Sequence, residues 1–206
     1  MPSCALRSRA YGPTKSMADI IEAQDSSPLL ERYLTPSGMA AAHAALIERY
    51  AWFLHVSDAD LFATIKSEGL KPNNPGCAAP DLVLKHLKDK AQKVLCLRPQ
   101  STFDTTPQRG NSRFVLAVGK QDLPTTIGLD WSYGGAWNLA GIIKSDAPKM
   151  SDEQVFCEVV RRWGSVITYD GIRASALRVR CEGMAEDDPA AWRELPTVER
   201  KDLYVF

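Results

Sequence analysis

The first residue whose type and position could do chemistry is His55. It lies near the end of an apolar run at 52–56, in which every second side chain shares one face of a strand. Ser57 then stands three residues before Asp60, a spacing that resembles a capping box and predicts a helix, and Gly69 supplies the residue that ends it. A strand, turn and helix in this order would hold an imidazole beside the first amides of the helix, where a polar ligand can bind.

The second such residue is Glu158, in the apolar run Val-Phe-Cys-Glu-Val-Val at 155–160. We interpret 154–162 as a strand, which places Glu158 between Phe156 and Val160 on one face. A carboxylate between apolar neighbours is costly to bury unless it meets a donor. The residues alone leave two interpretations open. Glu158 is either a structural acid, on an edge strand or paired with an arginine, or an acid that takes part in chemistry.

Two loops carry further candidates. Residues 100–112 are polar and rich in glycine, proline and threonine, which is typical of a functional or mobile loop. Residues 128–141 combine glycines with Trp131, Tyr133 and Trp137. Such aromatic rings can stack on a planar ligand or fill the core, and the sequence leaves both roles open.

The elements that must position these residues follow from periodicity and breaker residues. Helices are expected at 17–23, 29–34, 39–50, 57–69 and 80–92, and strands at 52–56, 93–97, 113–118, 154–162, 166–168 and 177–181. Pro99 is expected to stop the strand at 93–97. Helices followed mostly by strands favour an α+β fold with antiparallel sheets over a βαβ array.

The domain organisation is simple. Residues 1–16 are expected to be a disordered tail, and 17–206 a single domain with helices at 17–50, a core at 51–181 and an extension at 182–206. The extension is acidic and loop-like, and its end at 204–206 is expected to pack back on the domain. The N-terminal segment lacks the apolar core of a signal peptide.

Composition excludes several classes of protein. Of 206 residues, 45% are hydrophobic and 24% charged, which is ordinary for a soluble globular domain. Lys+Arg and Asp+Glu both number 25, so no net charge attracts nucleic acid or a membrane surface. The five cysteines form no Cys-x-x-Cys pair and predict buried thiols in a reducing compartment, with no disulfide framework and no metal site. No apolar run of about 18 residues exists to span a bilayer, and we expect a cytoplasmic protein.

Three pieces of the chain, in order, resemble the ADP-ribosyltransferase fold family, which includes diphtheria-type toxins and poly-ADP-ribose polymerases. The first runs from Leu-His-Val-Ser at 54–57 to the Gly-Leu that ends the next helix. The second comprises Phe-Val-Leu-Ala-Val at 114–118, Asp-Leu at 122–123 and Asp-Trp at 130–131. The third is Phe-Cys-Glu-Val-Val at 156–160 with the strands that follow it. The resemblance implies a split β-sandwich of two antiparallel sheets with flanking helices.

The resemblance also implies roles for individual residues in using NAD as a substrate. His55 would bind the adenosine ribose, and the backbone beside it at Val56 would hold the nicotinamide amide. Ser57 would contact NAD or only cap its helix. Glu158 would be the catalytic residue, binding the 2′-hydroxyl of the nicotinamide ribose, where hydrogen bonds strengthen as positive charge develops. Trp131, Tyr133 or Trp137 would stack on the nicotinamide.

The chain departs from the family pattern at two places. The middle motif, a Tyr or Ser on a strand, has no clean counterpart, and Arg98 and Ser101 are the nearest candidates. Members that modify arginine usually carry an acid or glutamine two residues before the catalytic glutamate, where this chain has Phe156. This argues against arginine as the acceptor.

The resemblance predicts a mono-ADP-ribosyltransferase of the toxin or effector kind, acting on a protein or nucleic-acid acceptor. An antitoxin or immunity protein is compatible with it as a partner, as is delivery into the cytosol of a target cell. The alternatives are an NAD glycohydrolase, a non-catalytic nucleotide-binding module of the same fold, and an unrelated α+β protein in which His55 and Glu158 are structural.

Overall fold

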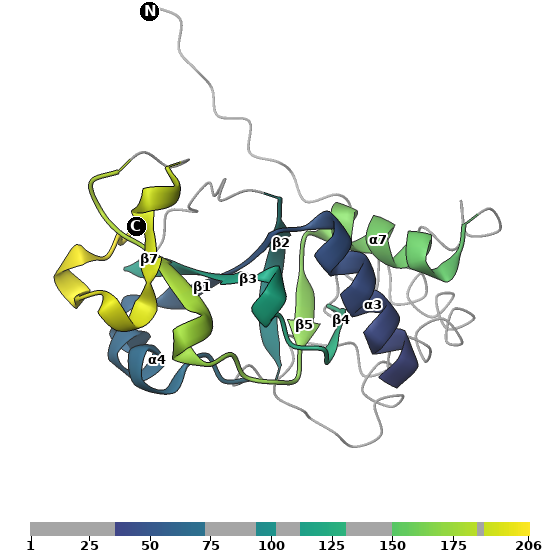
Figure 1. The fold of residues 1–206 in the computed structure, drawn as a ribbon, viewed down its shortest axis with the longest axis horizontal. Helices are drawn as coiled ribbons and strands as arrows, with labels where there is room; N and C mark the ends of the chain where they lie inside the picture. The colour runs from purple at the N-terminus through teal and green to yellow at the C-terminus, as the bar shows by residue number, and fades with distance from the viewer. Residues whose placement is uncertain (1–35, 73–93, 102–111, 131–149, 185–187) are drawn as a thin grey trace, which may run out of the picture.

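The fold is α+β, with helices packed on one antiparallel sheet (Figure 1). The structure is a computed structural model that describes residues 36–72, 94–101, 112–130, 150–184 and 188–206. The expected helices at 17–23, 29–34 and 80–92, and most of both loops, lie outside the described residues. No helix within the described ranges is long and apolar enough to cross a membrane.

Seven strands form the sheet, in the order β4-β5-β2-β1-β3-β6-β7. Their bounds are β1 Trp52–Asp58, β2 Leu95–Gln100, β3 Arg113–Gly119, β4 Ile127–Leu129, β5 Val166–Thr168, β6 Leu177–Arg180 and β7 Trp192–Glu194. The strands expected at 52–56, 93–97, 113–118, 166–168 and 177–181 are confirmed with small shifts of their ends. The short strands β4 and β7 were not expected, and the described strands form a single sheet.

Strand β2 joins two parts of this sheet. Its C-terminal half pairs with β1, from Trp52↔Gln100 to Leu54↔Arg98. Its N-terminal half pairs with β5 from Leu95 to Leu97. Past Leu54 the two neighbours of β2 therefore diverge, and β1 continues along β3 alone. The sheet consequently has a fork between β1 and β2.

Pro99 lies inside β2, so the expectation that it stops the strand is wrong. Pro99 stands opposite Phe53 of β1, beyond the last residue pair that joins β2 to β5. A proline is tolerated in a strand where one side has no strand partner, because its missing N–H then costs no ladder hydrogen bond.

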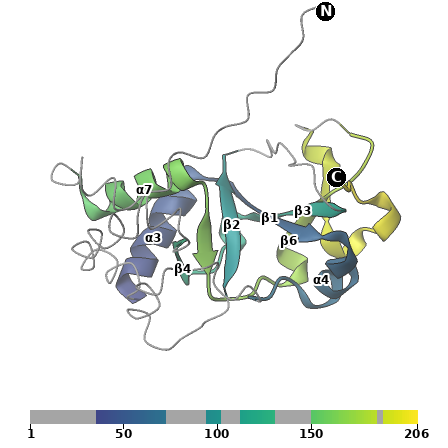
Figure 2. The same cartoon turned by 180° about the vertical axis from the view of Figure 1, so that it is seen from behind.

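Within the described ranges, three helices cover the sheet: α3 Pro36–Arg49, α4 Phe62–Glu68 and α7 Asp152–Trp163. Helix α3 confirms the helix expected at 39–50 and begins already at Pro36. Helices α3 and α7 lie side by side at the β4–β5 end, and α4 lies at the other end, as both ribbon views show (Figures 1 and 2). All three helices contribute to the main core cluster, which also takes in Phe53, Leu97 and Leu116 from the sheet. A smaller cluster around Leu54 and Trp192 lies on the opposite face.

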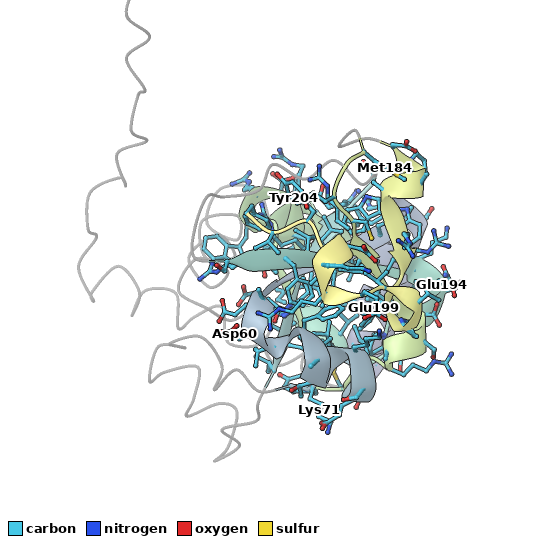
Figure 3. The ribbon with its side chains drawn as sticks, turned by 90° about the vertical axis from the view of Figure 1, so that its left-hand side faces the viewer. Asp60, Lys71, Met184, Glu194, Glu199 and Tyr204 are labelled. Carbon is cyan, nitrogen blue, oxygen red and sulfur yellow. The ribbon has the colours of Figure 1, made fainter. Side chains whose placement is uncertain are left out.

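The C-terminal extension packs back on the domain, as expected. Phe206 exchanges two backbone hydrogen bonds with Arg113 at the start of β3. The extension also meets the region of α4: Lys66 Nζ donates to the Val198 carbonyl at 2.7 Å, and Arg200 to Asp60 at 3.1 Å. Figure 3 shows this end of the molecule, with Asp60 beside the C-terminal segment. The extension thus closes one end of the sheet.

Candidate functional site

His55 lies in β1 directly past the last residue that pairs with β2. Its side chain shares a face with Phe53 and Ser57, because β1 pairs with β3 through His55↔Leu116 and Ser57↔Phe114. This face carries the main core, so the imidazole is half-buried. His55 is therefore positioned at the fork by the strand pattern that the sequence predicts.

The imidazole has a defined hydrogen-bonding state. Its Nδ1 lies 3.0 Å from the carbonyl oxygen of Cys96 in β2. A carbonyl only accepts, so Nδ1 carries the proton. Burial lowers the pKa of His55 below its ordinary value of 6.5, against a smaller opposing effect of the bond to Cys96. The ring is then neutral at pH 7, and its Nε2 is an acceptor with no hydrogen-bond partner within the described chain.

The bond to Cys96 also has a structural meaning. Had the β1–β2 ladder continued in register, Val56 would stand opposite Cys96. Because β1 and β2 diverge there, the Cys96 carbonyl does not pair with Val56, and the imidazole of His55 bonds it instead. A buried carbonyl needs such a hydrogen bond. The same divergence leaves the backbone of Val56 without a β2 partner, while Val56 still pairs with Val115 of β3. The Val56 side chain is on the opposite face and 39% exposed.

Ser57 does not cap a helix, and this prediction is wrong. It is a buried residue of β1, 7% exposed and opposite Phe114. Strand pairing with β3 continues to Asp58, and a 3-10 turn, η2 Ala59–Leu61, then leads into α4. No side-chain hydrogen bond caps either element. Pairing with β3 outweighs the local capping preference.

Of the remaining cofactor-site candidates, Arg98 does not lie beside the His55 imidazole. Arg98 stands opposite Leu54, so its side chain lies on the face away from the imidazole, where it is exposed. Ser101 directly follows β2 and is exposed. Trp131 and Tyr133 lie outside the described residues, and their expected stacking on nicotinamide stays a prediction.

Glu158 lies on helix α7, so the strand expected at 154–162 is wrong. Ser151 and Gln154 form a capping box at the start of α7, and Gly164 ends it in the left-handed conformation at φ 76°. Buried residues recur with helical spacing along it: Val155, Phe156, Cys157, Val159 and Val160. A run this apolar satisfies the alternation of a strand as well as the stripe of a buried helix.

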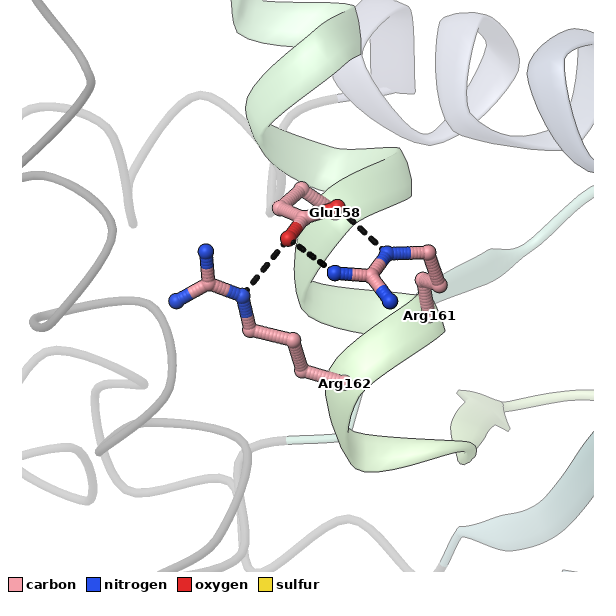
Figure 4. Close-up of polar contacts among 3 residues, drawn as sticks. All are labelled: Glu158, Arg161 and Arg162. Carbon is pink, nitrogen blue, oxygen red and sulfur yellow. Dashed lines mark hydrogen bonds and ion pairs between the residues drawn. The ribbon is translucent and has the colours of Figure 1, made fainter.

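Two arginines on the next turn hold the Glu158 carboxylate (Figure 4). Arg161 donates Nε to Oε2 at 2.7 Å and Nη2 to Oε1 at 2.6 Å, and Arg162 donates Nε to Oε1 at 2.6 Å. These hydrogen bonds, led by those from Arg161, outweigh burial and lower the pKa of Glu158 from 4.5 to about 2. The acid is therefore ionised at pH 7. The arginine pairing considered from the sequence is confirmed.

The structure does not join His55 and Glu158 directly. The imidazole bonds the main chain of β2, and both carboxylate oxygens of Glu158 are held by arginines. Helix α7, which carries Glu158, packs on α3 and β4. Any ligand that uses both residues must therefore bridge the fork and α7.

A second acid near α7 was not assigned to the site from the sequence. Asp130 follows β4, is 6% exposed, and accepts a hydrogen bond from Trp163 Nε1 at 2.9 Å. The signal available was an acid directly after the apolar run 127–129. This bond ties the end of α7 to β4 and so fixes the turn that carries the two arginines.

The described residues contain no group of three or more His, Cys, Asp or Glu that could hold a metal ion. The expectation of buried thiols, made for Cys96 and Cys157 within their apolar runs, is confirmed at Cys157, whereas Cys96 is only half-buried; Cys181 is also buried. Comparison of the chain with protein-family models, curated proteins and solved structures found no match.

Proposed function

We propose that this protein uses NAD as a substrate, cleaving the bond between nicotinamide and ribose and transferring ADP-ribose to a protein or nucleic-acid acceptor. The observation that carries the proposal is the state of His55. A neutral imidazole, fixed by its Nδ1–H to Cys96, presents an acceptor nitrogen at a fork in the sheet. Ribose hydroxyls are donors that fit such an acceptor.

The backbone at the fork supports a second contact. Val56 lies past the last β1–β2 pair, so its main chain faces no described strand on that side. A primary carboxamide offers two N–H donors and a carbonyl acceptor, and one N–H together with the carbonyl can pair with such a backbone in the manner of a strand. Nicotinamide carries this group. Val56 is therefore assigned to the nicotinamide amide, beside His55 at the ribose.

Glu158 is assigned as the catalytic residue. Loss of nicotinamide leaves positive charge on the ribose, and an anionic acceptor at the 2′-hydroxyl stabilises that charge most strongly in the transition state. The lowered pKa of Glu158 keeps it anionic across the physiological range. Nicotinamide is an adequate leaving group, so positioning and charge matter more than acid catalysis.

The proposal also covers the division of the sheet into two halves. Among the described strands, one group comprises β4, β5 and β2 and the other β1, β3, β6 and β7, and the two groups are joined only through the three residue pairs of β1 and β2. We assign these as the two halves of a split sandwich, with NAD at their junction. An NAD glycohydrolase would use the same site with water as the acceptor.

The test is nicotinamide release from NAD by the purified chain, followed by chromatography. We expect release by the wild type, and a loss of at least about 100-fold in Glu158→Gln, in line with removal of one transition-state contact. Glu153→Gln on the exposed surface of α7 is the matched control and should release nicotinamide at the wild-type rate. Equal rates in the wild type and Glu158→Gln, or no release by the wild type, would refute the assignment.

A second pair of variants tests the fork. His43 also places a ring nitrogen near a carbonyl, that of Leu123 at 3.2 Å, so His43→Gln controls for the loss of a structural histidine. We expect His55→Gln to raise KM for NAD and His43→Gln to leave it unchanged.

The acceptor is identified by a transfer assay. Labelled ADP-ribose is transferred to cell extracts that have been treated with protease or with nuclease, and the treatment that abolishes labelling shows whether the acceptor is a protein or a nucleic acid. Label that is recovered only as free ADP-ribose indicates hydrolysis.

A further inference from the structure

The turn of α7 that follows Glu158 places two guanidinium groups on one carboxylate. Three charge-assisted hydrogen bonds from two guanidinium groups converge on Glu158, from different sides of the carboxylate (Figure 4). Within the described chain, Arg173 and Arg200 each bond to a carboxylate without a second arginine on it.

The geometry is that of an oxyanion site. The Nε and Nη2 of Arg161 reach the two oxygens of one carboxylate, which is the bidentate arrangement by which arginine binds phosphate. Its Nη1 makes no hydrogen bond to a described residue. The side chain of Arg161 is 68% exposed and that of Arg162 36%, whereas that of Glu158 is 17% exposed. The guanidinium groups therefore face solvent, with the carboxylate beneath them.

We propose that Arg161 and Arg162 form a diphosphate-binding site that the Glu158 carboxylate occupies in the free protein. This rests on the proposed function, because the diphosphate is that of NAD. When a diphosphate binds the two guanidinium groups, the carboxylate gives up its three hydrogen bonds. The exchange breaks no covalent bond and moves no proton, since Glu158 and the diphosphate are both anionic. The freed carboxylate can then accept the hydrogen bond of a ribose hydroxyl.

The exchange explains how an acid held by two arginines can serve as a catalytic residue. A carboxylate whose oxygens are taken by guanidinium groups is a weakened acceptor for a hydroxyl. Binding of the diphosphate part of the substrate supplies the free energy that releases it. Arg161 and Arg162 are thus positioning residues, which act on the reaction through Glu158.

The test uses inorganic pyrophosphate as the probe, with binding measured by titration calorimetry. We expect Glu158→Gln to bind pyrophosphate about tenfold more tightly than the wild type, because the internal anion no longer competes. Arg161→Ala and Arg162→Ala should each bind it at least about tenfold more weakly. Arg173→Ala, an exposed arginine paired with Asp122, is the matched control and should bind as the wild type does. Thermal unfolding of each variant checks that it folds.

Three results would overturn the proposal: no gain in affinity in Glu158→Gln, wild-type affinity in both arginine variants, or orthophosphate binding as tightly as pyrophosphate. The first two would make the cluster an ordinary surface ion pair. Pyrophosphate has no glycosidic bond, so these results do not depend on turnover. Loss of the proposed function would instead appear as unchanged nicotinamide release in Glu158→Gln.

Discussion

Replacement of Gly69 by alanine tests the way α4 is fastened to the rest of the domain. Gly69 ends α4 at φ 77° and ψ −173°, a region of backbone conformation that is nearly exclusive to glycine. The next residue, Leu70, exchanges two backbone hydrogen bonds of 2.8 Å with Ile172. A methyl group at Gly69 would overlap the Ile172 carbonyl oxygen and lie 2.9 Å from the amide nitrogen of Ala174.

The cost of Gly69→Ala follows from these contacts. The backbone conformation alone costs about 1–3 kcal/mol in a residue with a Cβ atom. The three atoms nearest to the methyl group are all backbone, so they cannot be relieved by rotation of a side chain, and the Leu70–Ile172 bridge must open or shift. Losing its two hydrogen bonds adds roughly 1–3 kcal/mol. We expect a total loss of about 3–5 kcal/mol in the free energy of unfolding.

Gly164→Ala is the matched control. Gly164 also has a positive φ, 76°, at the end of α7, but a Cβ atom there would have no neighbour within 4 Å. Only the conformational cost remains, about 1 kcal/mol. Urea unfolding of both variants measures the difference, which should be at least about 2 kcal/mol or roughly 4–8 °C in Tm for a chain of this size. A Gly69→Ala variant as stable as Gly164→Ala would refute the reasoning.

Three further predictions concern charge and packing. The NMR titration midpoint of His55 should lie below 6.5, because burial lowers its pKa. Its contribution to stability is then complete above pH 6.5 and is lost as pH falls toward the folded-state pKa. A midpoint at or above 6.5 contradicts the half-buried neutral ring. Because the pKa of Glu158 is lowered, its ionised carboxylate stabilises the fold above pH 4.5, and this stabilisation is lost as pH falls toward 2. Glu158→Gln should therefore flatten the acid limb of the plot of stability against pH, by no more than about 1 kcal/mol because solvent screens the ion pair. An acid limb that is unchanged in Glu158→Gln counts against this prediction. Leu46→Ala in α3, at a site with 0% exposure, should cost about 2–5 kcal/mol in urea unfolding, and a loss below 1 kcal/mol would mean that this core is not packed as described.

The sequence predicts most of the strands because their apolar residues fit one periodicity. At β1, the alternation that separates Phe53 and His55 from Leu54 and Val56 leaves one register in which the core face is apolar. The position of His55 on the core face could be predicted for this reason. The fork beside His55 could not be predicted, because β2 leaves β1 in order to pair with β5. The residues of β5 lie about 70 positions after those of β2 in the chain.

Helix α7 was misassigned because nearly every residue from Val155 to Val160 is apolar. The decisive signal lay outside that run: Ser151 and Gln154 have the capping-box spacing, and Gly164 stands where a helix would end. The pair of Arg161 and Arg162 with Glu158 follows once the helix is known, since residues three and four apart share a helical face. As a strand, the same segment would have separated these side chains.

The three-residue strands β4 and β7 were beyond sequence reasoning for a different reason. Neither shows an apolar run recognisable as a strand, since β4 contains Gly128 and β7 has Trp192 as its one apolar residue, and each pairs with one edge of a neighbouring strand. Strand β7 pairs with β6 through Arg180↔Trp192, and β4 with β5 through Gly128↔Ile167. Such strands are consequences of the sheet already present.

Because β2 is shared between neighbours that are far apart in the chain, the order of synthesis matters. Strands β1, β2 and β3 can pair early, but the second edge of β2 has no partner among the described strands until Val166–Thr168 emerges. Non-local pairing of this kind slows folding, and an uncovered strand edge invites association with other chains. A nascent or truncated chain that stops before residue 166 should therefore need a chaperone to remain monomeric.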